Sequence, residues 1–107
     1  MKNTKNLFPI KDGELFILHK NGRDFLFSES SLIIRESEWE SKLPLRMAEM
    51  FYFEETFMLG LIQKREALNN NLSRVLQPET PTQKNLLNQI ISDLKEVDRM
   101  INSILST

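Results

Sequence analysis

The chain has 107 residues and a formal net charge of −1, because 14 lysines and arginines face 15 aspartates and glutamates. This length allows one domain with a modest core, and the near balance of charge differs from the basic footprint of most nucleic-acid-binding proteins. The sequence contains no cysteine, which excludes a disulfide, a thiolate metal site and a thiol nucleophile and fits a reducing, cytoplasmic location.

Two apolar runs of strand length lie near the N-terminus, at 15–18 and 25–27, and Asn21-Gly22 separates them. Asn-Gly is the preferred pair for a two-residue type I′ turn, because both residues tolerate positive φ. A third apolar run at 32–34 is short and β-branched. The pattern predicts an antiparallel β-meander of two or three short strands.

The C-terminal half has the apolar periodicity of two helices, predicted at 44–76 and 81–105. In the first helix, apolar residues recur in alternating steps of three and four, with polar interruptions at Glu54 and Arg65. The second helix repeats this spacing without interruption, at Leu87, Ile90, Leu94, Val97, Ile101 and Ile104. A short connection between two such stripes predicts an antiparallel, coiled-coil-like hairpin.

Capping signals mark the expected helix starts. Thr80 followed by Pro81 and, three residues after Thr80, by Gln83 is typical of an N-cap with proline at the first helical position. Ser37 and Glu40 have the spacing of a capping box, which predicts a single helical turn before the longer helix.

The expected fold class is therefore α+β, with the meander packed on the base of the helical hairpin. Residues 1–107 form one domain, in which 1–12 are a flexible lead-in and 14–35 the meander. If the hairpin folds back symmetrically, facing residue numbers sum to about 158, which places Arg65 near Asp93.

Few side chains in this sequence are suited to catalysis or to cofactor binding. His19 is the only histidine, and it should lie exposed beside the turn of the first hairpin. The glycines are isolated, so no phosphate-binding loop is present, and no nucleophile elbow occurs. We therefore expect no enzyme activity, catalytic residue, cofactor, metal or small-molecule substrate.

Membrane association is not expected either. The most apolar stretch, 45–62, contains Arg46 and three glutamates, Glu49, Glu54 and Glu55, so it cannot be a membrane span. Gly60 falls inside the same stretch, and a glycine within a helix predicts a close backbone contact.

The most unusual feature is a cluster of methionine and aromatic side chains between residues 47 and 58. Such residues form ordinary cores but are also favoured at adaptable interfaces. The candidate partner-binding residues are Trp39, Met47, Met50, Phe51, Phe53 and Phe57, with an acidic rim that includes Glu36, Glu38, Glu40, Glu49 and Glu55.

This cluster favours a protein–protein interaction module, acting as a small adaptor, a chaperone-like subunit, or a regulator or inhibitor of a larger protein. The partner is another protein or a second copy in a homodimer. The alternative is a nucleic-acid-associated regulator that dimerises through the hairpin. Its contact residues would be basic side chains of the β region with nearby aromatic rings, namely Lys2, Lys5, Lys11, Lys20, Arg23, Phe25 and Phe27.

Overall fold

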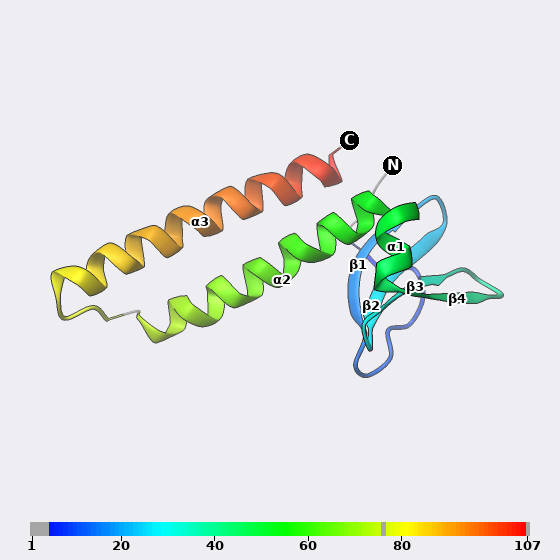
Figure 1. Cartoon of the computed structure of the whole chain (residues 1–107), viewed down its shortest axis with the longest axis horizontal. Helices are drawn as coiled ribbons and strands as arrows, with labels where there is room; N and C mark the ends of the chain where they lie inside the picture. The colour runs from blue at the N-terminus through cyan, green and yellow to red at the C-terminus, as the bar shows by residue number, and fades with distance from the viewer. Residues whose placement is uncertain (1–4, 76, 107) are drawn as a thin grey trace.

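A computed structural model describes residues 5–75 and 77–106 and gives the chain an α+β fold (Figure 1). In these residues a four-stranded antiparallel sheet, ordered β1-β2-β3-β4, precedes three helices. The elements are β1 (Leu15–Lys20), β2 (Arg23–Ser28), β3 (Ser31–Arg35), β4 (Glu40–Pro44), α1 (Leu45–Phe51), α2 (Phe53–Arg74) and α3 (Pro81–Leu105). The predicted fold class is confirmed. The sheet has four strands, whereas two or three were expected.

The two-residue turn between β1 and β2 has the geometry that its sequence predicts. Asn21 and Gly22 both have positive φ, 55° and 78°. The turn between β2 and β3 has the same form without a glycine, since Glu29 and Ser30 have φ of 50° and 60°. Residues other than glycine are rarely found in this left-handed region, so the turn falls where the predicted third strand requires one, but its positive φ angles do not follow from its residue types.

The fourth strand replaces the single helical turn that the capping-box spacing predicted. After β3 the chain turns tightly, and the backbone N–H of Glu36 donates to the carbonyl of Trp39 at 2.9 Å. β4 then pairs with β3 and places Leu43 opposite Leu32. The prediction was wrong because pairing along a sheet edge satisfies more backbone groups than one helical turn can.

One face of the sheet packs against the helices and forms the main core. Leu18, Phe25 and Ile34 are neighbours across β1, β2 and β3, and all three are buried. The helices add buried apolar side chains, which are Ala48, Met58, Leu59, Leu61, Val97 and Ile101. Because burying such a side chain contributes about 1.5–3 kcal/mol, this layer holds α1 and the base of the hairpin on the sheet.

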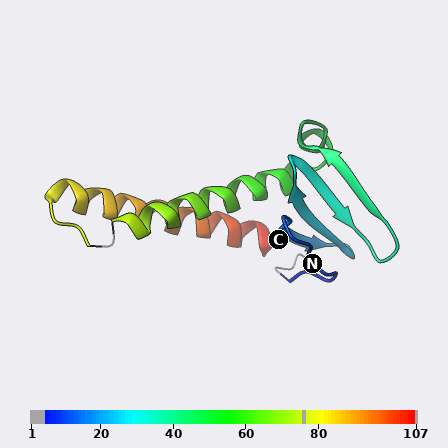
Figure 2. The same ribbon diagram turned by 90° about the horizontal axis from the view of Figure 1, so that it is seen from below.

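The N-terminal segment lies against the other face of the sheet (Figure 2). Leu26 on this face is fully buried, and the backbone N–H groups of Leu7 and Phe8 donate to the Asp24 carboxylate at 2.9–3.0 Å. The expectation of a flexible lead-in is therefore wrong for its described part, because a polar sequence does not reveal a buried acceptor on β2. Residues 1–4 of that lead-in lie outside the described residues.

The first predicted helix is two helices, α1 and α2, separated by Tyr52. Tyr52 has φ −132° and ψ 57°, which is not helical, and its ring packs on Phe25 with centroids 5.7 Å apart. The side-chain hydroxyl of Thr56 donates to the Tyr52 carbonyl at 3.1 Å, which supports the start of α2. The prediction of one continuous helix over 44–76 was wrong because the break at Tyr52 depends on a tertiary contact. Residue 76 lies outside the described residues.

The start of α3 confirms the predicted N-cap. The Gln83 backbone N–H donates to the Thr80 side chain at 3.1 Å, and the Gln83 side chain accepts from the Thr80 backbone N–H at 3.1 Å. Pro81 occupies the first helical position. This reciprocal pair satisfies two of the donors that a helix start leaves unpaired.

The predicted neighbours Arg65 and Asp93 do not form an ion pair, since Arg65 lies 3.6 Å from Asp98 instead. The register itself is close to the symmetric estimate, because Leu68 and Ile90, whose numbers sum to 158, line one pocket between α2 and α3. The prediction of a close backbone contact at Gly60 is also wrong for the described chain. A side chain built there would meet no atom within 4 Å, although glycine costs about 1 kcal/mol inside a helix.

Candidate interaction surface

Five of the predicted partner-binding side chains are exposed on α1 and on the first turns of α2. We call this set the elbow surface, and it consists of Met47, Met50, Phe51, Phe53 and Phe57. Met50, Phe53 and Phe51 are 77%, 71% and 69% exposed, and the other two exceed 40%. Single exposed apolar residues are common, but a cluster of this kind marks an interaction site.

Helical periodicity explains why these side chains point outward. In α1, Ala48 is fully buried, while Met47, Met50 and Phe51 are three and four residues apart and share an exposed face. The non-helical Tyr52 then redirects the chain, since its ring is held by the sheet. The elbow surface is therefore a product of the same break that the sequence did not reveal.

The α2 part of the elbow surface is formed by two phenylalanine rings. Phe53 and Phe57 are one turn apart, and their rings stack with centroids 6.0 Å apart and planes inclined by 24°. Met58 and Leu59, the next residues, are buried in the core. Both sides of the first turns of α2 are thus apolar, one facing the core and one facing outward.

An open pocket of about 660 Å³ borders the elbow surface. Its lining is mainly apolar and comes from the β2–β3 turn, the end of β4 and α1, namely Ser30, Pro44, Leu45, Arg46, Met47 and Met50. A pocket beside protruding methionines can receive an apolar side chain from a partner.

Trp39 does not belong to the elbow surface, contrary to the prediction. It lies in the β3–β4 turn, whereas α1 begins at the opposite end of β4 (Figure 2). Trp39 is 45% exposed, and the Arg23 guanidinium lies 5.7 Å from its ring centroid. The predicted single site is therefore two separate surfaces.

The predicted acidic rim is also not assembled around the elbow. Glu36 pairs with Arg23 and Glu40 with Arg35. Glu55 is buried and lies 3.4 Å from Lys20, so it joins α2 to β1. Each of these carboxylates is therefore paired with a cation of the same chain.

The charges nearest the elbow are balanced. Arg46 and Glu49 are the charged residues of α1, and both are exposed. Glu38 is exposed at the β3–β4 turn, beside Trp39. The elbow surface therefore has an apolar centre and a nearly neutral edge.

His19 is half-buried rather than exposed. Its Nδ1 lies 2.8 Å from Oδ1 of Asp24, a carboxylate with no solvent exposure. The Leu7 and Phe8 backbone N–H groups donate hydrogen bonds to the same carboxylate. Asp24 therefore serves as an anchor for the N-terminal segment, a role that its polar residue type in a strand could have suggested.

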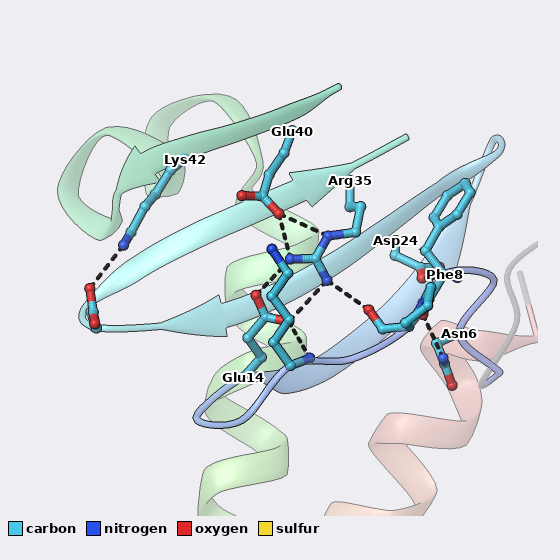
Figure 3. Close-up of polar contacts among 10 residues, drawn as sticks. Asn6, Phe8, Glu14, Asp24, Arg35, Glu40 and Lys42 are labelled. Carbon is cyan, nitrogen blue, oxygen red and sulfur yellow. Dashed lines mark hydrogen bonds and ion pairs between the residues drawn. The ribbon is translucent and has the colours of Figure 1, made fainter. Parts of the chain in front are cut away.

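A second buried polar cluster centres on Arg35 (Figure 3). Its guanidinium donates to Glu14 at 2.6 and 2.9 Å, to Glu40 at 2.8 Å and to the Pro9 carbonyl at 3.1 Å. Hydrogen bonding from Arg35 holds the pKa of Glu14 below its ordinary value, and the two carboxylates raise the pKa of Arg35. This cluster ties residues 9–14 to the sheet and has a structural role.

Residues considered for nucleic-acid contact are mostly engaged within the fold. Lys20 and Arg23 pair with Glu55 and Glu36, respectively. Phe25 is buried and Phe27 is half-buried against the core, so Phe25 offers no face for base stacking. Lys2 lies outside the described residues.

Neither a metal-binding group nor a membrane-spanning helix occurs among the described residues. Over 5–75 and 77–106, no group of three or more acidic or histidine side chains is arranged to hold a metal ion. No helix in this part of the chain has both the length and the apolar character needed to cross a membrane.

Comparison with known proteins gives no functional guide. No protein-family model, curated protein or solved structure matches this chain. The function must therefore be inferred from the geometry of the elbow surface.

Proposed function

We propose that the chain is a non-enzymatic protein–protein interaction module, cytoplasmic in location, that covers its elbow surface with another protein chain. The observation that carries this proposal is the exposure of five neighbouring methionine and phenylalanine side chains on a small protein. Fully burying each of these side chains would contribute about 1.5–3 kcal/mol, so they favour association strongly.

The composition of the surface supports the same proposal. Methionine and phenylalanine are enriched at protein interfaces, and methionine adapts to irregular partner shapes. The adjoining open pocket, with Met47 and Met50 on its edge, could accept one anchor side chain. Adaptor and inhibitor roles both require such a surface, and we propose no finer distinction between them.

The test compares substitutions inside and outside the elbow. Tagged protein is purified from a lysate of its source after nuclease treatment, and the mass of each co-purifying species is determined. We expect a stoichiometric protein partner, or a self-associated chain, that is lost with Met50→Glu and Phe53→Glu. Both positions are highly exposed, so these variants should fold normally.

The matched control is Leu86→Glu on α3, which changes an apolar side chain of 50% exposure far along the hairpin. This control should retain the partner. Loss of binding in the control, or retention in both elbow variants, would refute the proposal. Nucleic acid that co-purifies only when the nuclease step is omitted, with no protein partner, would favour the alternative function.

A further inference from the structure

α2 carries a second exposed stripe besides the seam that it presents to α3. Phe53, Phe57, Gly60 and Lys64 are spaced by four, three and four residues, and all are exposed. This spacing is that of a coiled-coil seam. A helix with two such stripes is suited to pack against two neighbouring helices, and α3 covers only one of them.

Gly60 lies in the middle of this stripe. A side chain built on it would meet no other atom of the described chain within 4 Å, so packing within the chain does not require glycine there. A helix that approaches closely from outside would require it, because glycine permits close contact between backbones.

The stripe is complementary to itself when two copies run antiparallel. With a two-fold axis between residues 58 and 59, Phe57 of one copy faces Gly60 of the other. The same axis places Phe53 opposite Lys64. A large ring thus meets a gap, and a second ring meets a lysine stem and its ammonium group, a favourable cation–π arrangement.

The sheet of each copy does not cover the stripe of the same copy. Glu55 contacts β1 through Lys20 and Leu59 is buried in the core, so the sheet lies on the side of α2 that faces away from the stripe. The balanced charges of Arg46 and Glu49 on neighbouring α1 introduce no net repulsion between copies.

We propose that a second copy of this chain covers the stripe, with the two α2 helices packed antiparallel about an axis near residues 58–59. The two α2 helices then overlap over about residues 53–64, so the two sheets lie near the middle of the dimer and the hairpin tips project in opposite directions. In such an isologous contact every pairing occurs twice, which doubles the effect of each complementary pair. This inference rests on the proposed function, since Phe53 and Phe57 belong to the elbow surface.

The first experiment measures the mass of the purified chain by sedimentation equilibrium over a range of concentrations. We expect a concentration-dependent dimer with twice the chain mass of 12.6 kDa. Gly60→Leu should weaken the dimer about tenfold or more, because a leucine fills the gap that receives Phe57.

The same variant separates loss of association from loss of folding. Position 60 has open space in the isolated chain, and leucine is a better helix former than glycine. The Gly60→Leu monomer should therefore melt at the same or a higher temperature. The matched control is Gln63→Leu, which adds a leucine at an exposed α2 position outside the stripe and should leave the dimer unchanged.

A distance measurement tests the antiparallel direction. The chain has no cysteine, so Asn71→Cys provides a single site for a spin label on α2. With the axis near residues 58–59, the two labels should lie about 40 Å apart, whereas a parallel pair would place them about 10 Å apart.

Three results would overturn the inference. They are a monomer at all concentrations, a dimer unaffected by Gly60→Leu, and a short label distance. A monomer that still captures a different protein through Met50 and Phe53 would refute the second copy and leave the proposed function intact. A monomer that captures nothing would refute both.

Discussion

Individual residues in the β2–β3 turn adopt a conformation that their side chains disfavour. Glu29 and Ser30 have φ of 50° and 60°, whereas Asn21 and Gly22 in the preceding turn are residues that tolerate positive φ. The carbonyl of Ser30 accepts from the Leu45 backbone N–H at 3.1 Å. The turn therefore aligns α1 with the sheet at the expense of backbone strain.

Replacing Ser30 with glycine should relieve this strain. Glycine adopts positive φ without a Cβ clash, so Ser30→Gly should stabilise the fold by about 1 kcal/mol. For a domain of this size the melting temperature should rise by about 4 °C, measured by thermal unfolding. The reverse change at the other turn, Gly22→Ser at φ 78°, should lower it, and a lower melting temperature for Ser30→Gly would contradict the assigned turn.

At the scale of elements, the sequence predicted the turns, caps and helices that depend on residues close together in the chain. The Asn21-Gly22 turn, the Thr80 cap and the uninterrupted apolar stripe of α3 were predictable, because each depends on residues a few positions apart. The sequence pointed to methionines and phenylalanines that the structure leaves exposed, but it could not separate surface from core. That distinction depends on which face of each helix the sheet covers.

Elements that depend on distant contacts were not predictable. β4 exists because β3 offers an edge, and the break at Tyr52 exists because its ring packs on Phe25. Glutamates placed in an acidic rim were instead neutralised by Arg23 and Arg35 from other strands. A local sequence pattern cannot predict which cation each of these glutamates contacts in the folded chain.

The contact between the N-terminal segment and the sheet should depend on pH. The Arg35 hydrogen bond lowers the pKa of Glu14 from an ordinary value of 4.5. A depressed carboxyl pKa contributes stability that is present above pH 4.5 and is lost as pH falls through the lower, folded-state pKa. Glu14→Gln should therefore cost roughly 1–3 kcal/mol at neutral pH, and its deficit relative to the native chain should shrink below pH 4.5.

Urea unfolding at a series of pH values measures this difference. The matched control is Glu96→Gln, which removes an exposed carboxylate that pairs with Arg99 on α3. Because solvent screens that pair, its loss should change stability little at neutral pH. A Glu14→Gln deficit that stays constant through the acidic range would show that Arg35 does not depend on the charge of Glu14.

At the scale of the whole molecule, the chain is elongated, with extents of 55 × 28 × 26 Å. The sheet and α1 form one end, and the hairpin projects from it (Figure 1). The elbow surface lies where these parts meet, so a contact there would fix the direction of the hairpin in any assembly.

The charge distribution predicts how such an assembly responds to salt. An acidic rim would make association sensitive to ionic strength, but the carboxylates at Glu36, Glu40 and Glu55 are neutralised within the chain. Association through the elbow surface should therefore change by less than about threefold in Kd when salt is raised severalfold, because apolar burial is little screened. Sedimentation equilibrium at low and high salt measures this. Nucleic-acid binding would instead weaken by orders of magnitude over the same range, since counterions are released from the phosphate backbone. A steep salt dependence of self-association would mean that charged residues outside the elbow form the contact, and the antiparallel α2 pairing would then be wrong.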